Sequence, residues 1–89
     1  TEPVISEIIP NPASTTATIK FAVPSTQLVT IELIDQLGNM VSTLSNSVFE
    51  GNIINNIDVT LNSSIASGLY SIRLTASGNS IVKTIAIVK

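Results

Sequence analysis

The chain has 89 residues, which is enough for one small domain with a modest core. Hydrophobic residues make up 44% of it and charged residues only 11%, so the chain is expected to fold and to cover its surface with Ser, Thr, Asn and Gln. A net charge of -2, four basic residues and no Trp argue against nucleic-acid binding. Cysteine and histidine are absent, and this removes the commonest general base, the thiol nucleophile and almost every zinc or copper site.

Apolar and polar residues alternate with a period of two along most of the chain, which predicts half-buried strands. In chain order the predicted strands are VISEII, TATIKFAV, QLVTIELI, NMVSTL, NIDVTL, LYSIRLTA and SIVKTIAIVK. The side chains predicted to face the core are Ala17, Ile19, Phe21, Val23, Val29, Ile31, Leu33, Ile57, Val59, Leu61, Tyr70, Ile72 and Leu74. No stretch has a sustained helical period.

Turn signals separate these strands, at VPST (23–26), DQLGN (35–39), SNS (45–47), EGN (50–52) and SGNS (77–80). We expect Gly38, Gly51 and Gly78 each to supply a positive φ, and TASGNSI to form a tight hairpin. Residues 62–68 are predicted to be a loop that crosses between sheets. The pattern predicts a single all-β domain over residues 1–89, an immunoglobulin-like antiparallel β-sandwich of about seven short strands.

The residues offer few candidates for chemistry. Asp35 is interpreted as the first residue of a turn, with its carboxylate accepting from backbone amides near Gly38. The alternative is a calcium ion between Asp35 and Glu50, although the dense acidic cluster that calcium favours is missing. The serines have no base to activate them, so we expect no enzyme activity. We also expect no bound metal, no cofactor and no small-molecule substrate.

Two polar features have simple interpretations. Arg73 and Lys83 lie on adjacent predicted strands and could form a small basic patch. The favoured interpretation is that they lie on solvated strand faces and pair with Glu32 or Asp58. The glycosylation pattern Asn62-Ser63-Ser64 is interpreted as a chance match in a chain rich in Asn and Ser.

Four landmarks occur in order: PNPAS (10–14), IELIDQLGNMV (31–41), SSIASGLYSIRL (63–74) and SIVKTIAIVK (80–89). Together they resemble the C-terminal sorting domain of the type IX secretion system of Gram-negative bacteria (type A, Por secretion system family), over essentially the whole chain. The matching residues are Pro10, Asn11, Pro12, Ala13, Asp35, Gly38, Gly68, Tyr70, Lys83, Ile85, Ile87, Val88 and Lys89. The chain departs from the family pattern at Ile9, where an aromatic residue is common, and at Asn39, where a basic one is common.

The resemblance implies a delivery tag that is a substrate and not a catalyst. The domain would be excised from a longer secreted precursor, which passes through the periplasm and is recognised by the outer-membrane type IX machinery. A sortase-like surface peptidase would cut around Thr1 to Ser6 or upstream, and would join the cargo to cell-surface lipopolysaccharide. The cargo would end at the cell surface or outside the cell.

We expect the closing strand to be the recognition element, because its apolar density is high where an edge strand is normally blunted by charge. The residues of this predicted site are Ile81, Lys83, Ile85, Ile87, Val88 and Lys89. Pro10-Asn11-Pro12 is predicted to shape the first corner and not to contact the machinery.

The same sandwich would also suit an immunoglobulin- or fibronectin-like structural spacer in a surface adhesin or a secreted glycan-degrading enzyme. A carbohydrate-binding module ranks far lower, because it usually presents aromatic residues to sugar rings and this chain has no Trp and a single, inward-phased Tyr. An enzyme ranks last, for want of an acid/base pair.

Overall fold

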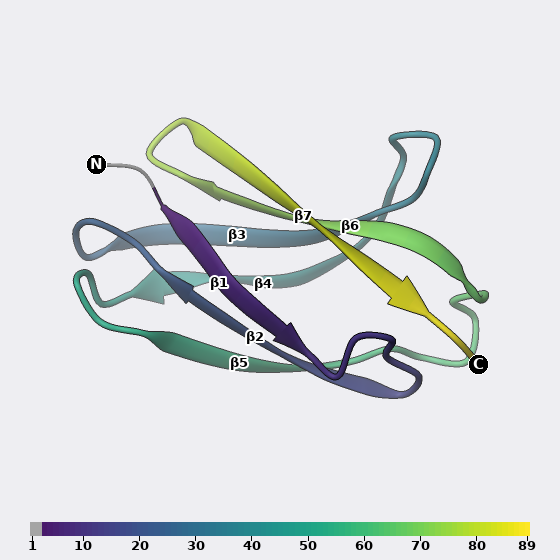
Figure 1. Ribbon diagram of the computed structural model, residues 1–89. Coiled ribbons are helices and arrows are strands. Elements are labelled where there is room, and N and C mark those ends of the chain that lie inside the picture. Colours follow the sequence, from purple (N-terminus) through teal and green to yellow (C-terminus); the bar gives the residue numbers. More distant parts are fainter. Residues whose placement is uncertain (1–2) are drawn as a thin grey trace.

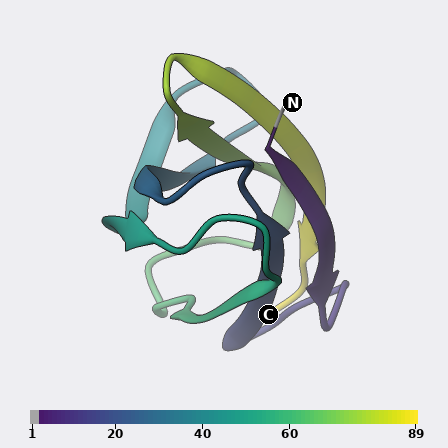
Figure 2. The same cartoon turned by 90° about the vertical axis from the view of Figure 1, so that its left-hand side faces the viewer.

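The computed structural model describes residues 3–89 and consists of two antiparallel sheets packed face to face (Figures 1 and 2). The strands are β1 (Val4–Ile9), β2 (Thr16–Ala22), β3 (Gln27–Ile34), β4 (Met40–Phe49), β5 (Asn55–Thr60), β6 (Gly68–Ala76) and β7 (Asn79–Ile87). One sheet has the order β1-β2-β5 and the other β4-β3-β6-β7. The predicted all-β sandwich is confirmed. Thr1 and Glu2, where the predicted cleavage region begins, lie outside the described residues.

The core lies between the two sheets. Every buried side chain among residues 3–89 is apolar. Of the predicted core set, eleven are buried and two, Ile57 and Tyr70, are half-buried against the rest. Phe21 also meets Phe49 edge to face, with ring centroids 5.0 Å apart. The period-two pattern therefore located the inner face correctly, because each strand has one packed and one wet side.

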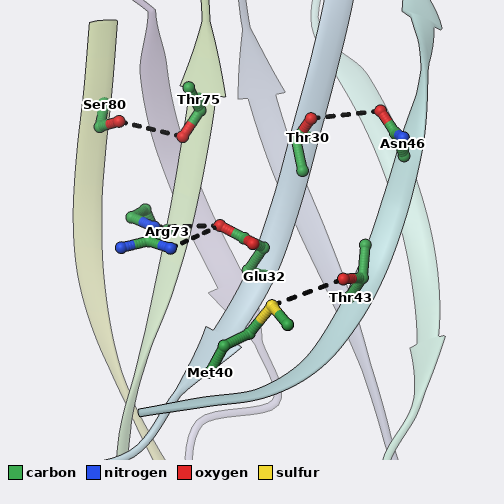
Figure 3. A network of polar contacts seen from close by, with 8 residues as sticks. All are labelled: Thr30, Glu32, Met40, Thr43, Asn46, Arg73, Thr75 and Ser80. Carbon is green, nitrogen blue, oxygen red and sulfur yellow. Dashed lines mark hydrogen bonds and ion pairs between the residues drawn. The ribbon is translucent and has the colours of Figure 1, made fainter. Parts of the chain in front are cut away.

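The outer face of the four-stranded sheet carries a network of polar contacts (Figure 3). Arg73 reaches across from β6 to β3, where its Nε and Nη2 donate to Oε1 of Glu32 at 3.0 and 2.8 Å. The predicted pairing of Arg73 with Glu32 is thus confirmed. A joint basic patch with Lys83 is wrong, because the β6–β7 register places Lys83 opposite Ile72, on the other face of the sheet from Arg73.

Two turn predictions need correction. SNS at 45–47 is not a turn, since β4 continues through it to Phe49. Strand β3 supplies a pairing partner along the whole of that length, and a register shift between Ile31 and Glu32 accommodates the extra residue. Exposed Ser and Asn residues are tolerated there because β4 is an edge strand with one wet face.

Gly51 does not adopt a positive φ; Asn52 does, at 61°. Glycine is required at position 51 for a different reason, because a Cβ there would lie 2.4 Å from backbone atoms of Ser25. The other two expectations are confirmed, with φ of 88° at Gly38 and 79° at Gly78. Ser77, at 48°, joins Gly78 in the predicted tight hairpin between β6 and β7.

Residues 61–67 cross from the three-stranded to the four-stranded sheet, as predicted for this loop. Within the part of the chain that the structure describes, no helix is long and apolar enough to span a membrane.

Candidate functional site

The Pro-Asn-Pro corner touches the closing strand. It turns the chain from β1 to β2, and both of its X–Pro bonds are cis. Asn11 Oδ1 accepts the Ala86 N–H at 3.0 Å, and the Ala13 N–H donates to the Ala86 carbonyl at 2.9 Å. The Val88 N–H in turn donates to the Ala13 carbonyl at 2.8 Å, which gives a parallel bridge between Ala13 and Ile87. Ala13 therefore forms a one-residue bridge on the edge of β7, and the Asn11 side chain adds a bond beside it.

Lys89 is bonded to the crossing loop. Its backbone N–H donates to Ser67 Oγ at 2.8 Å, and its Nζ donates to the carbonyls of Leu61 and Asn62 at 2.9 and 3.0 Å. A charged donor shared by two carbonyls makes stronger hydrogen bonds than a neutral donor. The residues after β7 are consequently held against the body of the domain.

Gly68 and Tyr70 begin β6 beside this contact. Gly68 lies opposite Ile87 and Tyr70 opposite Ile85 in the β6–β7 register. The Tyr70 hydroxyl donates to the Ala66 carbonyl at 2.8 Å, so a largely inward ring has its hydroxyl at the edge, as predicted. A tyrosine that bonds the backbone a few residues upstream also stabilises a corner in immunoglobulin-like sandwiches.

The Asp35–Gly38 turn has the predicted geometry. Asp35 Oδ1 accepts the N–H groups of Leu37 and Asn39, each at 2.9 Å. The bond from Asn39 is the main reason that the pKa of Asp35 lies below its ordinary value, with the Leu37 bond assisting and desolvation opposing. The carboxylate therefore closes its own turn. Among residues 3–89, no three acidic side chains gather in a way that would hold a metal ion.

The Asp35 turn lies across a shallow cleft from the start of β6. The cleft has a volume of about 340 Å³ and is lined by residues 35–37 and 67–70. Part of each of the four landmarks therefore lies at one end of the sandwich, on the right of Figure 1, although the landmarks are spread over the whole sequence. The hairpin between β6 and β7 lies at the other end.

Comparison with known proteins explains why these landmarks occur together. Residues 7–88 match the family described as the secretion system C-terminal sorting domain. The chain belongs to this family. It has no significant match among curated proteins or among solved structures.

This sorting domain is a C-terminal secretion signal for the type IX secretion system, and a structural spacer is not favoured. Membership implies interaction with that system and export through the outer membrane, to the cell surface or the outside. The family is one of sorting signals and not of catalysts.

The predicted recognition residues of the sorting domain fall into two groups. Ile85 and Ile87 are buried in the core, and Ile81 is half-buried. Lys83, Val88 and Lys89 are exposed, although the Lys89 ammonium is bound to the crossing loop. The second group lies at the surface of the folded domain, while the first group packs the strand against the core.

Sequence reasoning missed the contacts between the first and last landmarks. Nothing in PNPAS indicates that its Asn11 amide and Ala13 backbone bond residues 86–88. The Asn11–Ala86 contact joins residues 75 positions apart, so no local pattern in the sequence signals it.

Proposed function

We propose that the domain is the removable tag of a longer secreted precursor and that the outer-membrane machinery recognises the folded domain at β7. The observation that supports this most directly is the arrangement at the landmark end. There, Asn11, Ala13 and Ser67 fix the position of residues 86–89, so that the strand is held in one place. A preorganised surface is recognised with less entropic cost than a loose chain end.

We propose further that the precursor passes through the periplasm, and that a sortase-like surface peptidase then removes the domain and joins the cargo to lipopolysaccharide. The strand β1 begins only at Val4, so a cut before it would leave every strand of the domain intact. The sorting domain would then be released as a folded by-product.

The test is a reporter with an ordinary signal peptide, fused at its C-terminus to residues 1–89, in a bacterium that has the type IX system. We expect the reporter in the medium or on the cell surface, and in the periplasm when the system is deleted. A reporter that stays in the periplasm of the competent strain would contradict the proposed function. Deletion of residues 81–89 would remove side chains of the core and could unfold the domain. Substitutions of Lys83 and Lys89 are therefore the milder test of recognition.

A further inference from the structure

The N–H and C=O groups of successive β7 residues point to opposite sides of the strand, and the bonds to Asn11 and Ala13 show which residues point outward. The N–H and C=O of Ala86 and the N–H of Val88 bond Asn11 and Ala13, so even-numbered residues direct these groups away from β6. The β6–β7 register is continuous from Gly68–Ile87 to Ala76–Asn79, without a bulge. The N–H and C=O of Val82 and Thr84 must therefore also point outward, away from the sheet.

These outward groups of Val82 and Thr84 form an open edge. Strand β7 is the last strand of its sheet, and residues 3–89 provide no backbone partner for the two residues. Strand β1 runs beside β7 (Figures 1 and 2) but pairs with β2 in the other sheet. Val82 is 60% exposed, and Lys83 and Thr84 are exposed as well.

The other edges of the sandwich are less suited to pairing. Strands β1 and β4 contain register shifts, which bend an edge and interrupt its ladder. Strand β5 pairs without a shift but is only six residues long, and its exposed side chains are the polar Asn56, Asp58 and Thr60. Strand β7 alone combines a continuous nine-residue register with an exposed aliphatic side chain at its open edge.

The domain already shows what kind of segment this edge binds. Ala13 of its own chain bonds Ala86 and Val88 at this edge through its main-chain N–H and C=O, as a strand would, and the Asn11 side chain accepts the Ala86 N–H beside it. We propose that an extended segment of the type IX machinery continues this row by pairing with Val82 and Thr84, as an added strand. This inference rests on the proposed function of the domain.

The side chains beside the edge indicate the chemistry of that segment. Val82 projects on the outer face of the sheet, opposite Arg73 in the register, and Lys83 projects on the other face. Consecutive residues of an added strand alternate between the same two faces. The segment therefore has an apolar residue beside Val82 and an adjacent acidic residue beside Lys83. An unpaired Lys83 would disfavour strands without that charge.

The test uses the reporter fusion with Val82→Pro, which removes the outward N–H and leaves the bonds to β6 in place. Val82→Ala is the matched control, because it truncates the side chain and keeps the N–H. We expect secretion to fall roughly tenfold or more for Val82→Pro and less than about twofold for Val82→Ala, with thermal melts of the purified domains showing that both fold.

The outcomes separate the two proposals. If the unsubstituted fusion stays in the periplasm, the proposed function fails. If that fusion is secreted and a folded Val82→Pro fusion is secreted equally well, the added strand alone is overturned.

If Val82→Pro does not fold, amide exchange of the unsubstituted domain decides. The probes are detergent-solubilised outer membranes from a strain that has the type IX system and from a strain that lacks it. We expect amide exchange at Val82 and Thr84 to slow with membranes from the strain that has the system, and to stay unchanged with the other membranes. Unchanged exchange overturns the proposal. So does a dimer of the isolated domain that protects the same amides, because a second copy would then occupy the edge.

Discussion

Two segments of the closing strand differ in how the rest of the molecule contacts them. The anchored segment (residues 85–89) has two isoleucines in the core, an edge bonded by Asn11 and Ala13, and a terminal lysine bonded to the crossing loop. The open segment (residues 79–84) is mostly exposed, and its outward backbone groups have no partner among residues 3–89. The contacts that hold the strand and the edge proposed for recognition therefore lie in different parts of β7.

The largest expected contrast is in core packing. Ile87→Ala should cost about 2–5 kcal/mol in the free energy of unfolding, because the side chain is 1% exposed and its loss leaves a cavity. Val82→Ala, in the open segment, should change it by less than about 0.5 kcal/mol. Urea unfolding of the purified domain measures both. Ile87→Val, at about 0.5–1.5 kcal/mol, is the fallback if the larger truncation unfolds the domain. Similar costs at positions 82 and 87 would remove the contrast.

Proline substitutions test the direction of the backbone groups within the open segment. Lys83→Pro should destabilise the domain by about 1–3 kcal/mol more than Val82→Pro, because the Lys83 N–H points toward β6 and the Val82 N–H points to solvent. The two prolines replace adjacent residues of one strand, so the destabilisation that does not come from a lost hydrogen bond should be about the same in both variants. Thermal melts of the two variants give the comparison, and equal destabilisation would mean that the assigned phase of β7 is wrong.

The Asn11 side chain tests the anchor. Asn11→Ala should cost about 1 kcal/mol, because the Ala86 N–H loses its acceptor. Exchange of the Ala86 amide should become faster while that of Val82 stays as it was. Asn46→Ala is the matched control, since the exposed Asn46 side chain accepts only the Thr30 hydroxyl on the outer face, and its loss should have little effect. An Asn11→Ala domain with unchanged Ala86 exchange would show that the corner does not anchor the strand.

The smallest effect concerns the Asp35 turn beside the landmark end. Its pKa is lowered in the folded state, so the stabilisation is fully present above the ordinary value of 3.8 and is lost as the pH falls through the folded value. Asp35→Asn removes this titration. The difference in unfolding free energy between the two proteins should therefore shrink in acid below pH 3.8, as measured by urea unfolding across that range. A difference that grows in acid would have the wrong sign for this turn.

The inner face of the sandwich was predictable because alternation has a local cause. Ile19, Ile31 and Leu74 are each 0% exposed, and each was identified from its immediate neighbours along the chain. The same applies to Asp35, whose carboxylate bonds amides only two and four residues away. Features that depend on a few adjacent residues can be inferred from the sequence alone.

The division of β7 was not predictable in this way. Ile81, Lys83 and Ile85 continue one alternation, and nothing local distinguishes an open edge from a bonded one. The difference arises from Asn11 and Ala13, about 75 residues away in the chain, which reach only the C-terminal part of the edge. The turn assigned to 45–47 failed for the same reason, because pairing with β3 overrode the local preference of Ser and Asn.

Amide hydrogen exchange of the isolated domain tests the central claim most directly, since it reports each β7 residue separately. We predict fast exchange at Val82 and Thr84, and slow exchange at Ala86 and Val88 that approaches the rate of the β6-bonded residues 83, 85 and 87. Uniform protection along β7, or fast exchange at Ala86 and Val88, would contradict the division into an anchored and an open segment.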